Sequence, residues 1–568
     1  MTDYTRKVVN VKKALEQEDL LDYGFEHRDK TTVEVKFDYF IQEGSKKNNY
    51  SVTGYIFIPK ALKVNKETYS KVKFYRDFQG FIRFQTPIFP IKAIANPKNG
   101  LSPLNRIRDL LQAFVNGTGG RNEIHELEYE LKMLAQIFRS NLRNQVIFLV
   151  DLISRDDTVE IIVDSVSEIL EAIDDVQVAF LSLERLIYTM QLPEHLRACY
   201  RAADEYMSYY IEHYLTILHG RLERDAMFTQ VLPDLQEMVF TQQDRRKRLK
   251  YNLVIGDAWK GWDGASTKLV GDSTDSGTPG DSGAARDVED KNDNAAGVPV
   301  STVNHHARRD PSKFQYWKST LKQYIKSVLD LEIIRSKSMA RYRQAIAVVG
   351  AAVAMAVSVL TGFLLELYLP NTSLPFILAV MVAYALKDRI KSSINSSGEK
   401  MLRRWFPDEK YEIQDPLTGQ EIGRCKESMA FITREQVPQE VMDIRNKDRH
   451  SILEREAGNE EIIKYRKGIK LYARKILQLH ERHKNINDIL HINIQNFLNY
   501  GLDPEERVPY LDRQQRVIKD VPVPVMYHLN IILQLQYKTG DDGVKTQFKR
   551  IRIVFNKQGI QDVEEINT

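Results

Sequence analysis

The stretch AIAVVGAAVAMAVSVLTGFLLELYLPNTSLPFILAVMVAYAL, residues 345–386, holds two apolar runs in an otherwise hydrophilic chain of 568 residues. The first run lies within residues 344–365, which include no charged side chain. At about 1.5 Å per residue, a helix of this length crosses the ~30 Å hydrocarbon core of a bilayer. We therefore predict a transmembrane helix, which places the protein in a membrane.

The second apolar run, residues 374–386, is short for a membrane span. As a helix it covers only about 20 Å. Two interpretations stand. In the first, Lys387 and Arg389 extend to the far headgroups and the pair forms a two-pass transmembrane hairpin over residues 344–390. In the second, the pair is a wedge that enters and leaves by the same leaflet. The compact turn at residues 370–373 favours the two-pass hairpin.

Small side chains recur at four-residue intervals along the first run and again in the second. Such ridges allow helices to approach closely in lipid. The favoured interpretation is that the two helices of the hairpin pack on each other, and the alternative is a contact between copies of the chain. The candidate helix-packing residues are Gly350, Ala354, Ser358, Gly362, Ala379 and Ala383.

Basic residues flank both apolar runs, whereas the turn between them carries no Lys or Arg. By the positive-inside rule, both termini are expected in the cytoplasm, at the plasma or inner membrane. Only Cys199 and Cys425 occur, which excludes a disulfide framework and fits a reducing compartment. The candidate contacts to lipid headgroups are Arg341, Arg343, Lys387, Arg389, Arg403 and Arg404.

The remaining chain divides by composition. Residues 271–299 contain no Ile, Leu, Met or aromatic side chain, so this part cannot bury enough apolar surface to order itself. We expect an α+β subdomain at 1–100, a helical bundle at 101–260, a disordered acidic linker at 261–311, a stalk helix at 312–343, the hairpin at 344–390 and a C-terminal domain at 391–568.

In the first 260 residues, alternating apolar positions predict a β-hairpin-like pair of strands at 31–41 and 50–58. A helix is expected over 66–84. From 101 to 250, apolar residues at three- and four-residue steps predict a helical bundle. The basic cluster at 245–250 is interpreted as a solvated helix end rather than a lipid contact.

In the C-terminal part, heptad spacing over 462–490 predicts a long amphipathic helix, with an oligomeric coiled coil as the alternative. Strands at 523–537 and 548–555, with a third at 561–566, form a short meander. The fold class expected is therefore α+β and integral to the membrane. It is mostly helical, with a small N-terminal β-containing region, a two-helix transmembrane hairpin and a C-terminal long helix followed by a β-meander.

Chemistry-bearing motifs are absent from the sequence. Gly280-Asp281-Ser282-Gly283 resembles a nucleophile motif but lies in the linker, where nothing can position a base. His480, His483 and His491 are interpreted as surface histidines of a helix rather than a metal site. We expect no catalytic, cofactor-binding or metal-binding residue and no cofactor. The net charge of +4 makes no case for nucleic acid.

Three function classes remain. The favoured one is a membrane-anchored assembly, sensing or scaffold protein whose partners are the bilayer, a cytosolic protein and a second copy of the chain. The first alternative is a pore-forming effector triggered through its cytosolic domains. The second is an enzyme whose site is assembled from residues that are distant in sequence.

Overall fold

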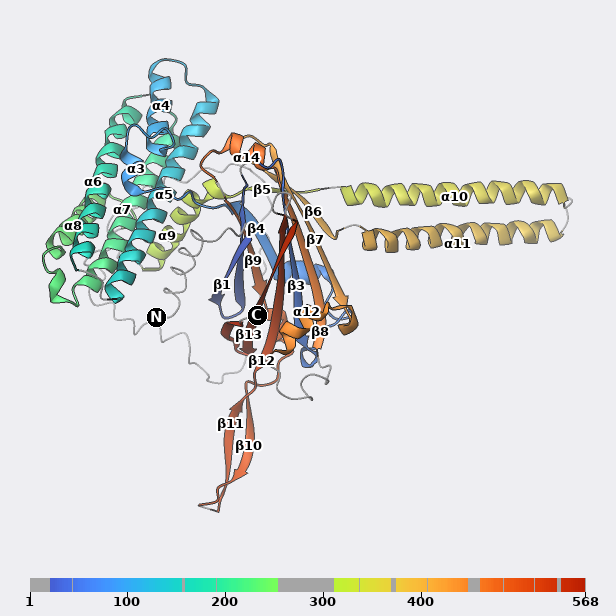
Figure 1. Cartoon of the computed structure of the whole chain (residues 1–568). Coiled ribbons are helices and arrows are strands. Elements are labelled where there is room, and N and C mark those ends of the chain that lie inside the picture. Colours follow the sequence, from blue (N-terminus) through green and yellow to red (C-terminus); the bar gives the residue numbers. More distant parts are fainter. Residues whose placement is uncertain are drawn as a thin grey trace, which may run out of the picture. The chain divides into compact units, whose positions relative to one another are not determined.

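The computed structural model describes residues 21–42, 44–155, 159–190, 192–253, 311–336, 338–368, 374–405, 407–447, 460–483, 485–514, 516–538 and 543–566. These residues form two compact units (Figure 1). The helical unit lies within Ile88–Val328, and the sheet unit combines Val9–Pro87 with Leu329–Thr568. The expected linker falls largely outside the described residues, which stop at 253 and resume at 311.

The helical unit is a bundle in which α5 packs on α7 and α7 packs on α8. Pro occupies the first turn of α4 and of α8, where a missing N–H is tolerated. The helical bundle expected from the three- and four-residue steps is present in this unit. The helices are α3 (Ile91–Ala95), α4 (Pro103–Val115), α5 (Arg121–Ser154), α6 (Val159–Thr189), α7 (Glu194–Leu222), α8 (Leu232–Arg248) and α9 (Pro311–Lys326), with 3-10 turns η2 (Ala226–Phe228) and η5 (Ser327–Leu329).

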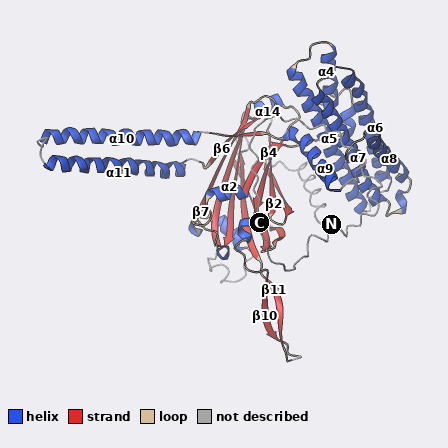
Figure 2. Cartoon of the chain, turned by 180° about the vertical axis from the view of Figure 1, so that it is seen from behind, coloured by secondary structure: helices blue, strands red, loops and turns tan. Residues whose placement is uncertain are grey.

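The sheet unit contains a large antiparallel sheet, ordered β14-β13-β12-β3-β8-β7-β6-β5, and a small one, ordered β1-β2-β9-β4 (Figure 2). A separate ribbon pairs β10 with β11. The strands are β1 (Leu21–Asp29), β2 (Thr32–Phe40), β3 (Asn48–Pro59), β4 (Phe78–Phe84), β5 (Glu332–Arg335), β6 (Glu409–Gln414), β7 (Glu421–Ile432), β8 (Glu460–Leu471), β9 (Asn485–Asn493), β10 (Glu505–Leu511), β11 (Ile518–Pro524), β12 (Tyr527–Lys538), β13 (Val544–Asn556) and β14 (Gly559–Ile566).

Several short helices and the two long helices α10 and α11 complete the sheet unit. The two sheets contact each other through their inner faces, where the rings of Tyr39 on β2 and Tyr50 on β3 lie 4.9 Å apart. Helix α12 packs on β12 and, with Tyr55, Phe57 and Ile532, encloses an apolar cluster on the other face of the large sheet. The helices are η1 (Lys60–Leu62), α2 (Lys71–Asp77), α10 (Ser338–Tyr368), α11 (Leu374–Trp405), η6 (Arg434–Gln436), α12 (Gln439–Asn446), α14 (Ala473–Leu479) and α15 (Gln495–Leu498).

Strand β3 lies in the middle of the large sheet, between β12 and β8. Its side chains are buried at nearly every position, so it needs neighbours on both edges and cover on both faces. The hairpin expected from 31–41 and 50–58 is therefore wrong, because β2 pairs with β1 and β9 instead. Strands expected in two separate domains, at 1–100 and 391–568, belong to one sheet unit in the structure.

The long helix expected over 462–490 is also wrong. The structure has β8, α14 and β9 in its place. Both strands alternate between inward and outward positions, but each has a charged residue at an inward position, Lys467 in β8 and Asp488 in β9. These two charges interrupted the alternating apolar pattern, and the remaining apolar residues coincided with heptad spacing.

Two further expected helices, at 66–84 and 312–343, are shorter in the structure than the sequence predicts. The expected helix at 66–84 ends at Asp77 and continues as β4, whose Phe84 and Ile82 point into the core. The expected stalk helix at 312–343 is divided into α9, η5 and β5 before α10 begins. In both places, apolar side chains at three- and four-residue steps also suit a short helix followed by a strand.

The predicted fold class is wrong in its balance of elements and in its hairpin. Strands form a large eight-stranded sheet rather than a minor part. Helices α10 and α11 do pack side by side (Figure 1). Among the described residues, however, only Gln344–Leu367 of α10 is long and apolar enough to cross a membrane. Helix α11 fails because Lys387, Asp388 and Arg389 follow its short apolar start.

Candidate functional site

The most exposed apolar surface of the described chain is on α10. Within Gln344–Leu367, only 11% of an 18-residue apolar stretch is buried. Val348, Met355 and Phe363 are each more than 60% exposed. A helix in the core of a soluble protein buries such side chains against its own chain. The exposed apolar surface of α10 therefore indicates a contact with lipid or with another protein.

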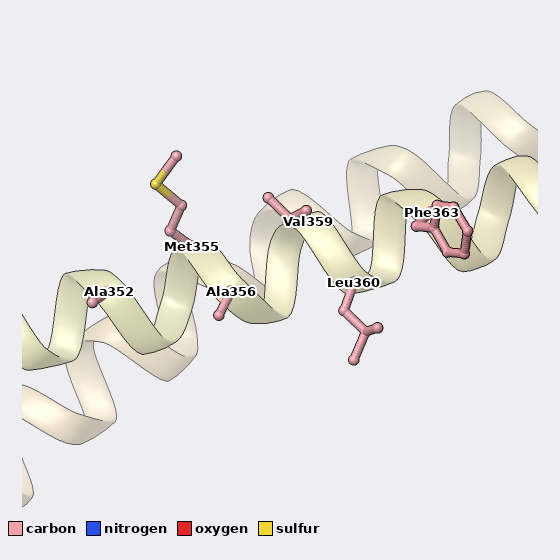
Figure 3. A pocket seen from close by; sticks show the side chains of 6 residues that line it. All are labelled: Ala352, Met355, Ala356, Val359, Leu360 and Phe363. Carbon is pink, nitrogen blue, oxygen red and sulfur yellow. The ribbon is translucent and has the colours of Figure 1, made fainter.

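A shallow hollow of about 640 Å³ lies on this surface (Figure 3). It forms where Ala352 and Ala356 leave space beside larger neighbours, since a methyl group fills less volume than the side chains of Met355 or Phe363. No polar group lines its floor to orient a ligand, so the hollow has the character of a packing surface rather than of a chemical site. The lining residues are Ala352, Met355, Ala356, Val359, Leu360 and Phe363.

The residues proposed for helix packing lie in different places. Gly350 and Ala354 are buried and Ser358 is half-buried on the side of α10 that packs on α11. Gly362 is exposed, and a Cβ added there would meet nothing within 4 Å. On α11, Ala383 is half-buried, and the side chain of Ala379 lies outside the described part.

Of the residues proposed as headgroup contacts, two have described side chains. Lys387 is half-buried, with its ammonium group 5.3 Å from the centre of the Tyr384 ring. Arg389 is exposed. The side chains of the other four, Arg341, Arg343, Arg403 and Arg404, lie outside the described part.

A buried ion cluster lies between the two sheets of the sheet unit. Lys467 Nζ is 2.7 Å from Asp488 Oδ1 and 3.2 Å from Glu427 Oε1. The hydroxyl of Tyr39 donates a hydrogen bond of 3.0 Å to Asp488 Oδ2. Lys467 is 3% exposed and Asp488 is fully buried, so the cluster is closed to a substrate that diffuses in from solvent.

Strand register brings these groups together. Glu427 on β7 and Lys467 on β8 are directly opposite each other in the large sheet. Asp488 extends from β9 of the small sheet, so the Lys467–Asp488 contact joins the sheets. At Gly80 on β4, an added Cβ would lie 3.0 Å from Lys467 Nζ, so glycine leaves the space that the ammonium group occupies.

Burial dominates the electrostatics of the cluster. Burial raises the pKa of Asp488, although the charge of Lys467 acts in the opposite direction. Burial alone would lower the pKa of Lys467, but the carboxylates of Asp488 and Glu427 outweigh burial and raise it. Burial also raises the pKa of the Cys425 thiol, which contacts Glu427 Oε1 at 3.8 Å. Two carboxylates thus share one cation in a place without solvent.

A second polar cluster joins the turn after β6 to the segment between α14 and β9. Asp415 Oδ1 lies 2.7 Å from His480 Nε2, and Asp415 Oδ2 accepts hydrogen bonds from the backbone and hydroxyl of Thr418. Although burial acts to raise it, the pKa of Asp415 is lowered by these bonds. The ring of His483 stacks on Phe84 with centroids 4.3 Å apart. Burial lowers the pKa of His483 to about 3, with the neighbouring His480 as a further cause.

This arrangement predicts acid sensitivity of the sheet unit. The pKa of His483 is below its ordinary value of 6.5, so the unfolded chain binds a proton that the folded chain excludes, and stability falls as pH decreases from about 6.5 towards 3. We expect the His483→Gln variant to lose less stability between pH 7 and pH 5 than the wild type in urea unfolding. The His528→Gln variant, at an exposed position, is the control. Equal pH dependence in all three proteins would contradict the role of His483.

The third histidine lines a polar groove of about 520 Å³ at the small sheet. His491 Nε2 lies 2.8 Å from Arg28 Nη1, and Asp77 accepts hydrogen bonds from Tyr69 and Asn496. Arg28 and Arg76 are opposed by Asp29 and Asp77, so formal charges balance and the groove has no strong ionic preference. His480 and His483 therefore lie together, with ring centroids 5.4 Å apart, whereas His491 lies on β9 at the polar groove. The expectation that all three are surface histidines of one helix is wrong.

The sequence interpretation missed the Lys467–Asp488–Glu427 cluster. One signal was available, because a charged residue inside an alternating apolar strand often has a buried partner. Comparisons with protein-family models, curated proteins and solved structures found no match to this chain.

Proposed function

We propose that this protein is a membrane-attached assembly or scaffold protein, held at a lipid bilayer by α10. The observation that supports the proposal is the 24-residue apolar segment that stays exposed in the folded chain. Transfer of such side chains from water to hydrocarbon is favourable by about 25 cal/mol per Å². Lipid hydrocarbon can surround the apolar surface that α11 leaves exposed, because lipid chains adapt to the shape of the helix and need no hydrogen bonds.

The way α10 and α11 leave the sheet supports one further part of the proposal. Helix α10 follows β5 and α11 precedes β6, and these two strands pair with each other. This pairing supports the proposal that both flanking segments lie on the same side of the membrane. The basic residues on both flanks favour the cytoplasmic side, with Lys387 and Arg389 near anionic headgroups. Reporter fusions at the two termini test this orientation.

A deletion tests the attachment itself. Arg335 on β5 and Tyr411 on β6 are register partners, so a short Gly-Ser turn can replace residues 338–406 without opening the sheet. We expect the wild type to sediment with membranes after an alkaline carbonate wash and the deletion variant to stay in the supernatant. A matched variant that loses the ribbon tip, residues 512–517, should sediment as the wild type does. If the 338–406 deletion variant remained with the membranes, α10 would not be the attachment.

A further inference from the structure

Lys467, Asp488 and Glu427 have the arrangement that amide formation between two side chains requires. Lys467 Nζ lies 2.7 Å from Asp488 Oδ1, so the carboxyl carbon bonded to that oxygen is within about 4 Å of the nitrogen, close to the 3–3.5 Å of a near-attack conformer. A third group able to accept and return a proton, Glu427, lies 3.2 Å from the same nitrogen.

The geometry leads us to propose that Lys467 Nζ and Asp488 Cγ join in an intramolecular isopeptide bond, with Glu427 as the proton-transferring residue. The bond would connect β8 of the large sheet to β9 of the small sheet. The inference concerns the sheet unit and is independent of the proposed membrane attachment.

The reaction balances without a co-reactant. Lys467 reacts as the amine and Asp488 as the carboxylic acid. The lone pair of Nζ attacks Cγ, a C–N bond forms, and Glu427 takes one proton from the nitrogen. Glu427 then gives this proton to the departing hydroxyl group, the C–O bond breaks, and one water molecule leaves. Nothing is oxidised or reduced, and Glu427 returns to its starting state.

Burial acts towards the neutral form of each reacting group, whereas the carboxylates of Asp488 and Glu427 hold the resting Lys467 as the ammonium ion, so a proton has to leave Nζ before it can attack. Separated charges are poorly solvated between the sheets, so transfer of the Lys467 proton to a carboxylate removes two of them. Burial also raises the pKa of Asp488, which favours its acid form. The strands hold nitrogen and carbon in fixed positions, and such an arrangement corresponds to a very high effective concentration of the two groups.

The product fits the same partners. The hydroxyl of Tyr39, now 3.0 Å from Asp488 Oδ2, can donate to the carbonyl oxygen of the new amide. The amide N–H remains beside Glu427 on the opposite strand. One cation and one carboxylate are replaced by a neutral group with a donor and an acceptor. The bond therefore removes a buried ion pair, whose desolvation opposes folding.

Intact mass measurement of the denatured full chain tests the proposal. We expect the wild type to weigh less than the 65.9 kDa sequence by one water, about 18 Da. A tryptic digest should contain residues 467–470 joined to residues 485–507, since an acylated Lys467 is not cleaved. The Lys467→Arg variant should have its full sequence mass, because a guanidinium group keeps its charge and does not attack the carboxyl carbon.

Two further variants separate the roles of the residues. Glu427→Gln keeps the size of the side chain but not the proton acceptor, and it should show the full sequence mass or a much slower loss of water. Lys464→Arg, on the same strand and half-buried, should lose water as the wild type does. A wild-type mass equal to the sequence mass overturns the proposal. So does a water loss that persists in Lys467→Arg, because the dehydrated group would then lie elsewhere.

Discussion

The Arg246→Met variant is expected to lose about 3–5 kcal/mol of stability in the helical unit, because it leaves the carboxylate of Glu212 buried without its cation. Arg246 is fully buried on α8 and forms an ion pair with Glu212 on α7, which is 5% exposed. Burial lowers the pKa of Arg246 to about 10, although the neighbouring Glu205 and Tyr209 act in the opposite direction. Hydrogen exchange of α7 peptides in the full chain, measured across a urea series, reports this loss.

A second replacement distinguishes loss of charge pairing from loss of packing. In Arg246→Met/Glu212→Leu both charges are gone, so most of the lost stability should return. Arg248→Met changes an exposed member of the same basic cluster and should alter stability by less than about 0.5 kcal/mol. If the double variant were as unstable as the single one, the packing of the Arg246 side chain would matter more than its charge.

Arg246 also shows what limits prediction from sequence. Four consecutive basic residues, 245–248, end a helix, and this pattern is typical of a solvated surface. The acidic partner Glu212 is on α7. No local sequence pattern indicates which helical turn of α7 will pack against the turn of α8 that carries Arg246. Arg245 is paired in the same way, with Asp204 at 2.8 Å. Apolar periodicity predicted that this unit is a helical bundle, but it did not identify the polar contacts between the helices.

The sheet unit was harder to predict because its contacts are distant in sequence. Strands β12 and β13 were predicted as neighbours, since a short turn joins them and their side chains alternate. Strand β3, by contrast, pairs with residues more than 400 positions away, a choice that alternation cannot encode. Lys467 and Asp488 concealed two strands because a charge at an inward position resembles a surface position until its partner is known. The same two residues then form the cluster with the most distinctive chemistry.

Acidic substitutions on α10 are expected to have the largest effect on membrane attachment. Met355 and Val359 are each 64% exposed and lie one helical turn apart beside the hollow of Figure 3. An aspartate near the centre of a membrane helix costs about 2.5–3.5 kcal/mol. The Met355→Asp/Val359→Asp variant should therefore show a fall of at least about 100-fold in its partition between membrane and supernatant.

A control with the same added charge on α11 separates the effect of charge from the loss of apolar surface on α10. Ser392 and Ser396 are exposed on α11 with the same four-residue spacing, so Ser392→Asp/Ser396→Asp adds equal charge to the polar part of the pair. We expect this control to stay with the membranes, and Met355→Leu/Val359→Leu to do so as well, because leucine keeps the surface apolar. Equal release of both aspartate variants would mean that added charge, rather than loss of an apolar surface, detaches the protein. Retention of both would show that α10 does not lie in hydrocarbon, and its exposed face would then have to be covered by protein.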